Sequence, residues 1–378
     1  MSEALERAGG SAESGGFEDL TVNFGPQHPS THGVLRLIVR LDGETIAGAQ
    51  PDIGYLHRGI EELMERHTYA QNVVYTDRLD YVSAVTNEFG YVLAVEKLLQ
   101  VEVPKRAQYL RVIAAELQRI ASHLIFVATF GNDLGATTVF LYGFRDREPV
   151  LDLLDEVSGQ RLTHNYLCIG GVNWDAQPGF DQRVLKYVDY FSERINEYDG
   201  LLTGNEIFVQ RTKGVGRIAT GAALDIGLSG PNLRATGFRY DVRKAEPYSS
   251  YGDFEFDIPV GQQGDTFDRY WVRLQEMRQS LRIIRQAVEG LPEGEYRAKA
   301  PRVIKPPVGA AYGHVEGSKG DVGYYVVSDG SERPYRVKIR GPSFIHVAAL
   351  PQMLVGGKVA DLVAVLGSID ILLGEVDR

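Results

Sequence analysis

Four short segments of the sequence carry side chains that can bind metal, transfer protons or hold charge. The first is GPQHPSTHG at 25–33, which places His28 and His32 in a loop that two prolines constrain. A pair of histidines can share a metal ion. Residues four apart share one face only in a helix, so in such a loop the spacing does not bring the two rings together. The alternative is a structural or solvent-exposed role for both rings.

The other three segments are GYLHRG at 54–59, YTDRLDY at 75–81 and FGNDLGA at 130–136. The first contains His57 and Arg58. The second gathers two tyrosines, two aspartates and Arg78, and it also fits a polar helix start capped by aspartate. The third places Asp133 just past a strongly periodic segment, where a helix end and a turn would account for it. Taken singly, none of these segments predicts a reaction.

Hydrophobic periodicity predicts the elements that position these residues. Every second residue over 35–41 is leucine or valine, and Asp42-Gly43 follows, which indicates a β-hairpin. A second hairpin is expected around Asp329-Gly330, between strand patterns near 325–327 and 335–339. Apolar residues recur at three- and four-residue steps in five further segments, which predicts helices. These segments are 68–99, 104–125, 148–162, 181–204 and 264–290.

The whole pattern predicts an α+β protein, mainly a helical bundle with small flanking β-sheets. We expect a flexible N-terminal tail at 1–17 and a β-rich region at 18–60. A helical core would follow at 61–300, and a C-terminal region of strands, helix and tail at 301–378. There is no Gly-rich dinucleotide signature and no P-loop, so nucleotide binding has no support in the sequence.

Composition excludes several classes of function. The 40 basic and 50 acidic residues leave a net charge of -10, which argues against nucleic acid as a partner. The single cysteine, Cys168, permits neither an internal disulfide nor a cysteine cage for a metal. The N-terminus lacks the apolar core of a signal peptide, and no apolar run approaches the roughly 18 residues of a membrane span. If the protein works at a membrane, other chains must anchor it.

Taken together and in order, the motifs resemble the quinone-site subunit of complex I, the NADH-quinone oxidoreductase. The likeness runs from about Leu20 to Arg378 and includes GPQHPSTHGVLRL, IGYLHRGIEELMERHTYAQN, YTDRLDYVSAVTNEFGYVLAVEKLL, YRVKIRGPSF and GSIDILLGEVDR. This family is related to the large subunit of nickel–iron hydrogenases, so the resemblance implies a hydrogenase-like fold.

Hydrogenase large subunits hold their metals with two Cys-x-x-Cys pairs. The resemblance puts the first pair at Asp80 and Ser83 and the second at Leu372 and Glu375. Since such a site requires thiolate ligands, their replacement at all four positions excludes hydrogenase activity and predicts that this chain binds no metal or cluster of its own.

In the complex I family the vacated space is the inner end of a quinone tunnel. Motif matching implies that Tyr81 and His32 hydrogen-bond the quinone headgroup, with Asp133 paired to His32. These types suit quinone reduction, which consumes two electrons and two protons: a phenol and an imidazole can each donate a proton, and a carboxylate raises the proton affinity of the imidazole. We therefore expect Tyr81, His32 and Asp133 to be the catalytic residues.

The resemblance also implies that electrons arrive from an iron–sulfur cluster of a partner subunit and that Arg58 lies close to that cluster. A salt bridge of Arg58 to Glu61 or Glu62 is the alternative. Many relatives carry a histidine beside the cluster at the position of Thr163. Here the histidine is one residue further on, at His164, which we expect to point elsewhere.

The expected partners are a B-like cluster subunit, a C-like subunit and an H-like subunit of the membrane arm, with NADH oxidised by other chains. The expected location is the cytoplasmic side of the cell membrane, as a peripheral subunit. Two rival interpretations remain: the same role in a ferredoxin- or deazaflavin-dependent enzyme, and a non-catalytic scaffold. The segment 307–320 is shorter than in most relatives, which puts in doubt any contact that a longer loop would make; no proposed site residue lies in it.

Overall fold

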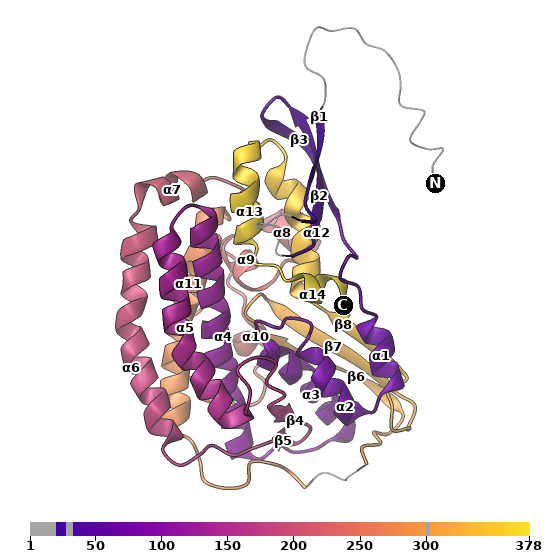
Figure 1. The fold of residues 1–378 in the computed structure, drawn as a ribbon. Coiled ribbons are helices and arrows are strands. Elements are labelled where there is room, and N and C mark those ends of the chain that lie inside the picture. The colour runs from indigo at the N-terminus through magenta and orange to yellow at the C-terminus, as the bar shows by residue number, and fades with distance from the viewer. Residues whose placement is uncertain (1–19, 28–32, 300–302) are drawn as a thin grey trace.

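A computed structural model describes residues 20–27, 33–299 and 303–378 of the chain. The expected tail at 1–17, together with His28 and His32, lies outside these residues. The described part is mainly helical with small antiparallel sheets, which confirms the α+β class (Figure 1). The closer likeness to a hydrogenase large subunit stays a prediction.

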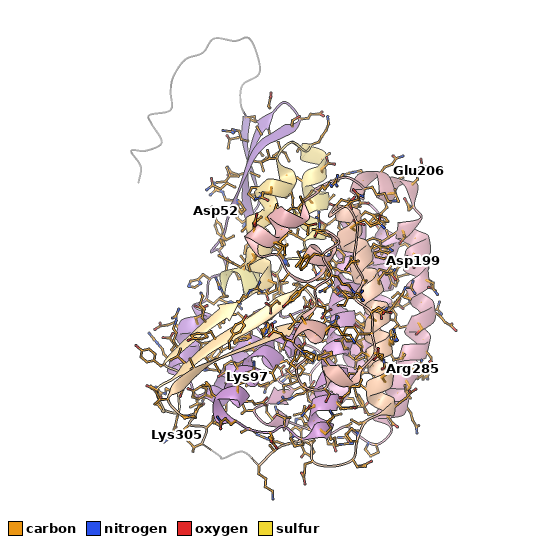
Figure 2. All side chains as sticks on the ribbon, turned by 180° about the vertical axis from the view of Figure 1, so that it is seen from behind. Asp52, Lys97, Asp199, Glu206, Arg285 and Lys305 are labelled. Carbon is orange, nitrogen blue, oxygen red and sulfur yellow. The ribbon has the colours of Figure 1, made fainter. Side chains whose placement is uncertain are left out.

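Four long helices form the bundle on one side of the molecule (Figure 1): α4 (Lys105–Asp133), α5 (Thr137–Ser158), α6 (Phe180–Tyr198) and α11 (Thr266–Glu289). By length and composition α4 could cross a membrane, but 89% of its most apolar stretch is buried inside the protein. It is the central helix of this core. Ion pairs such as Arg285–Asp189 join the outer faces of α6 and α11. Figure 2 shows Arg285 of α11 and Asp199, which directly follows α6.

Two three-stranded sheets flank the bundle. The first has the order β1 (Leu20–Phe24), β2 (Arg36–Asp42), β3 (Thr45–Asp52), and the second β6 (Gly309–Glu316), β7 (Asp321–Ser328), β8 (Arg336–Arg340). The buried face of the first sheet shares a core with α12 (Pro342–Leu354), α13 (Leu362–Ser368) and α14 (Leu373–Asp377). The beginning and end of the described chain are thus packed together, as Figure 1 shows.

Shorter elements connect these layers. Helices α1 (Ile60–Arg66), α2 (Tyr69–Thr76) and α3 (Ala84–Leu99) follow the first sheet, and α3 packs on β6 and β7. The remaining strands and α-helices are β4 (Leu167–Cys168), β5 (Gly171–Val172), α7 (Glu206–Thr212), α8 (Thr220–Ile226), α9 (Gly230–Arg234) and α10 (Val242–Ala245). Three short π- or 3₁₀-helical segments are η2 (Asp199–Thr203), η3 (Tyr251–Asp253) and η4 (Val359–Asp361).

Most predicted elements are confirmed, and three expectations were wrong in detail. The helix expected at 68–99 is interrupted at 77–83, where buried polar side chains form a turn. The helix expected from 148 begins at Thr137 and contains Pro149 in its interior, and the central helix runs on to Asp133, which is therefore its last residue. Strand β6 was missed because its residues, GAAYGHVE, are small or polar and lack a strong apolar alternation.

Candidate functional site

The turn at 77–83 between α2 and α3 carries Tyr81, one of the three residues expected to do chemistry. Asp80 is buried, with 2% of its surface exposed, whereas the next residue, Tyr81, is 39% exposed. The Asp80 carboxylate accepts a hydrogen bond from the backbone N–H of Val82 at 3.2 Å, and the Asp80 carbonyl accepts one from Ser83 at 2.9 Å. These bonds close the turn and direct one functional side chain inward and the other toward the surface.

The C-terminal segment 370–375 lies directly against this turn. A Cβ atom on Gly374 would sit 2.6 Å from the carbonyl oxygen of Leu79, so only glycine permits the approach. Glu375 accepts a hydrogen bond from the backbone N–H of Ser343 at 2.9 Å. The two segments in which the resemblance places cysteine pairs are therefore neighbours. Their four side chains are buried, at Asp80, Ser83, Leu372 and Glu375.

Buried charges fill the space beneath the turn. The Lys319 ammonium lies 3.1 Å from the Asp80 carboxylate and 3.9 Å from that of Asp370, and Arg273 lies 3.6 Å from Asp370. Although burial acts in the opposite sense, these two carboxylates raise the pKa of Lys319 and keep it cationic. Two cations thus balance two anions. Lys319 was not expected from the sequence. Its one signal there is a lysine between glycines in GSKG, inside the segment thought to hold no site residue.

Glu375 is a third carboxyl in this buried space. Burial, and then the charge of Asp80, raises the pKa of Glu375 to about 7. Its Oε1 atom accepts no hydrogen bond from any residue that the structure describes. Near neutral pH this group therefore exists partly as the acid and can hold a proton behind the turn.

Arg58 joins the turn to the C-terminal segment. Its guanidinium donates to the carbonyl oxygens of Arg78 at 2.7 Å and Gly374 at 3.0 Å. Burial lowers the pKa of Arg58, while the nearby Tyr81 and Asp377 raise it. In the described part of the chain neither Glu61 nor Glu62 forms an ion pair with Arg58, so the salt-bridge alternative is not realised.

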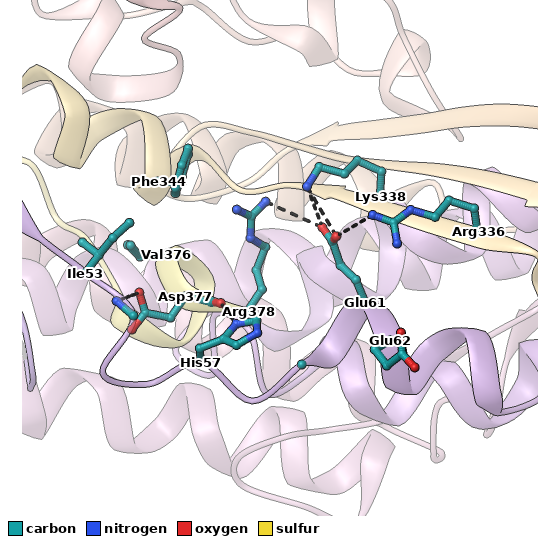
Figure 3. A pocket seen from close by; sticks show the side chains of 12 residues that line it. Ile53, His57, Glu61, Glu62, Arg336, Lys338, Phe344, Val376, Asp377 and Arg378 are labelled. Atoms are coloured by element: carbon teal, nitrogen blue, oxygen red, sulfur yellow. Dashed lines mark hydrogen bonds and ion pairs between the residues drawn. The ribbon is translucent and has the colours of Figure 1, made fainter. Parts of the chain in front are cut away.

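A surface pocket is lined by His57 and Gly59, the chain neighbours of Arg58 (Figure 3). At its wall Glu61 is held by Lys338 at 3.1 Å, Arg336 at 3.3 Å and Arg378 at 3.7 Å. The adjacent Asp377 carboxylate accepts hydrogen bonds from two backbone N–H groups of the segment 54–56, at 2.9 and 2.7 Å. The last residues of the chain thereby position the segment that carries Arg58.

Asp133 lies beside Gly367, just before the C-terminal segment 370–375. A Cβ atom on Gly367 would sit 3.7 Å from its Oδ2 atom, and the backbone N–H of Asp370 donates to the Gly367 carbonyl at 3.3 Å. The stretch 367–375 thus runs from Asp133 to the turn that carries Tyr81. Because His32 lies outside the described residues, its expected pairing with Asp133 stays a prediction.

The sequence of this chain matches a known family. The family model "Respiratory-chain NADH dehydrogenase, 49 Kd subunit" matches residues 133–308 and 302–378. Proteins named as the D-type subunit of NADH-quinone oxidoreductase are similar over almost their full length. That of Desulforamulus reducens is 57% identical over 360 residues, which are 95% of this chain and 98% of the relative. That of Dehalococcoides mccartyi is 54% identical over 362 residues, 96% of this chain and 99% of the relative.

The chain belongs to the 49 kDa subunit family of NADH-quinone oxidoreductases. The predicted family is confirmed, and it is a family of oxidoreductase subunits.

In this family member, Thr163 is half-buried and its hydroxyl donates to the Leu162 carbonyl at 2.6 Å. His164 is buried, and its Nδ1 lies 2.8 Å from the Gln160 carbonyl oxygen. Burial lowers the pKa of His164 to about 4, so the ring is neutral, and its Nδ1 contact turns it into its own loop.

The next feature of this oxidoreductase subunit is the arrangement of side chains that could hold a metal ion. Across the described residues, no group of three or more His, Cys, Asp or Glu side chains is arranged to hold a metal ion. Cys168 is buried in β4, and burial raises the pKa of its thiol, which therefore stays protonated.

Proposed function

We propose that this chain forms the headgroup end of the quinone site in a proton-pumping NADH:quinone oxidoreductase. One observation carries the proposal: Tyr81, partly exposed, stands on the turn that meets the C-terminal segment. The resemblance puts the metal ligands of hydrogenases in these same two segments. The shared name of the relatives, as subunits of NADH-quinone oxidoreductase, supports quinone as the substrate and NADH as the electron source.

The side chains at this place suit proton delivery to a quinone. Reduction to the quinol takes up two electrons and two protons. Burial, and then the charge of Asp80, raises the pKa of Tyr81, so its hydroxyl keeps its proton and donates a hydrogen bond. His32 would donate to the other side of the headgroup, with Asp133 as its carboxylate partner. Each proton that is transferred would then be replaced from solvent or from buried acids behind the turn.

We further propose that Arg58 faces the iron–sulfur cluster of a B-like partner subunit. The support is its geometry: two backbone carbonyls hold the guanidinium, and no carboxylate among the described residues forms an ion pair with it. A fixed positive charge near a cluster raises the cluster's potential. C-like and H-like subunits would complete the assembly and anchor it on the cytoplasmic side of the cell membrane.

The test is site-directed substitution in the assembled complex. Tyr81→Phe and His32→Ala should each lower quinone reductase activity by more than about tenfold, the order of losing a proton donor. Asp133→Asn should act more weakly, because the imidazole remains. Tyr335→Phe, at a tyrosine that is 68% exposed, is the matched control.

Cluster reduction and co-purification of the other subunits should persist in every variant. Normal activity of both Tyr81→Phe and His32→Ala with the native quinone would refute the headgroup assignment. The input subunits that co-purify with the parent chain distinguish NADH from ferredoxin or a deazaflavin as the donor.

A further inference from the structure

An acidic residue at the start of the site turn lies near a second one on α3, inside the protein. Asp77 directly follows α2 and Glu88 lies in the second turn of α3, and both are 0% exposed. Their carboxyl groups are close enough for each to shift the pKa of the other. One oxygen of each, Asp77 Oδ1 and Glu88 Oε1, has no hydrogen-bond donor among the described residues. Since an ionised carboxylate only accepts hydrogen bonds, a bond between the two groups requires that one of them keeps its proton.

The outward oxygens of this pair hold a single loop. The Asp77 Oδ2 atom accepts from the backbone N–H of Asn165 at 3.0 Å, and the Glu88 Oε2 atom accepts from that of Leu167 at 2.6 Å. The loop needs outside support, because Thr163 and Asn165 have φ values of 55° and 44°, which are unfavourable for residues other than glycine.

The surroundings of the pair favour one negative charge and oppose two. The guanidinium of Arg78 lies 3.5 Å from Asp77 and is half-exposed. Tyr324 is a titratable side chain close to both carboxyls, and its hydroxyl donates to Asn87 at 3.2 Å. The inward oxygens of Asp77 and Glu88 accept no hydrogen bond from another side chain that the structure describes. Burial raises the pKa of each, in Glu88 well above its ordinary value.

We propose that Asp77 and Glu88 share one proton and act as positioning residues that fix the loop 163–167 against the turn carrying Tyr81. This inference rests on the proposed function, since the turn matters for catalysis only if the quinone binds there. When the proton leaves at alkaline pH, two buried carboxylates repel each other and the loop loses its anchor. The pair thereby gives this region a titratable proton, which the Thr163 hydroxyl cannot supply.

Glu88→Gln is the informative variant, because an amide can accept from Leu167 and donate to Asp77 at any pH. In the assembled complex, parent activity should fall at alkaline pH while cluster reduction persists, and Glu88→Gln should keep its activity over the same range. Because amide exchange is itself catalysed by hydroxide, each rate is divided by that of an unstructured peptide at the same pH. The resulting protection of the 163–167 backbone amides in the parent should be at least about tenfold weaker at alkaline than at neutral pH, the order of one lost buried hydrogen bond. In Glu88→Gln this loss of protection should be absent.

Infrared difference spectroscopy gives a signal that a purely structural role would not produce. Protonated Glu375 contributes the C=O stretching band of a buried carboxyl in both proteins. The spectrum of the parent minus that of Glu88→Gln should therefore contain the C=O stretching band of one further buried protonated carboxyl, which Glu88→Gln lacks. Glu289→Gln, at an exposed residue of α11, is the matched control and should behave as the parent.

An unchanged band, or an unchanged alkaline dependence of exchange in Glu88→Gln, would overturn the proposal. Exchange and infrared spectra need no turnover. If Tyr81→Phe were fully active while both signals behaved as expected, the quinone assignment would fail and the proton-sharing pair would stand.

Discussion

Glu375→Gln tests whether the charges beneath the site turn are balanced as the structure indicates. Lys319 and Arg273 neutralise Asp80 and Asp370, so ionised Glu375 would leave one excess negative charge in a buried space. Burial raises the pKa of Glu375 to about 7. Glutamine keeps the size of the side chain and the acceptor for the Ser343 N–H, but it cannot ionise.

The magnitude follows from proton linkage. An unfolded glutamate has a pKa of about 4.3 to 4.5, so the shift to about 7 is roughly 2.5 units, or about 3.4 kcal/mol. Because the folded pKa is raised, the folded state binds more protons than the unfolded one between the two values. Stability is therefore lost as pH rises through this range. The parent should lose about 2.5 kcal/mol between about pH 5 and pH 8 from this group alone.

The assay is denaturant unfolding of the full chain at several pH values. The free energy of unfolding of Glu375→Gln should exceed that of the parent by an amount that grows by about 2.5 kcal/mol over that range. Glu289→Gln, at an exposed position, should show no such growth. A difference between Glu375→Gln and the parent that does not change with pH would refute the charge count.

Two further outcomes test the contacts around the turn. Gly374→Ala should lower the free energy of unfolding by about 1–3 kcal/mol, because the added Cβ would lie 2.6 Å from the Leu79 carbonyl oxygen. Gly221→Ala is the control, because a Cβ there meets no atom within 4 Å. Equal effects of the two substitutions on the free energy of unfolding would contradict the close approach of Gly374 to Leu79. The potential of the partner's cluster should depend little on pH in the parent, since His164 is buried and neutral. Thr163→His should bring the dependence toward about 60 mV per pH unit, as redox titrations would measure; a parent slope of that size would disprove the argument.

The hydrophobic pattern within each segment was sufficient to predict the long helices and the strand β2. The alternation over 35–41 predicts β2, and the three- and four-residue steps predict α4 and α11, because each of these segments buries one continuous apolar face or stripe. The interruption at 77–83 could not be predicted in this way. The apolar period runs on across it, and only the buried partner of Asp80, Lys319 from the far end of the chain, accounts for a turn there.

The sequence by itself determined what chemistry is absent and which family the chain resembles. One cysteine cannot rebuild two thiolate pairs, whatever the fold. The tertiary structure decided which charges meet. Arg58 has two glutamates within four residues, yet it donates to the carbonyls of Arg78 and Gly374, since Glu61 is taken by cations of β8 and the C-terminus. Charges pair across space according to burial and packing, and spacing along the chain does not specify that.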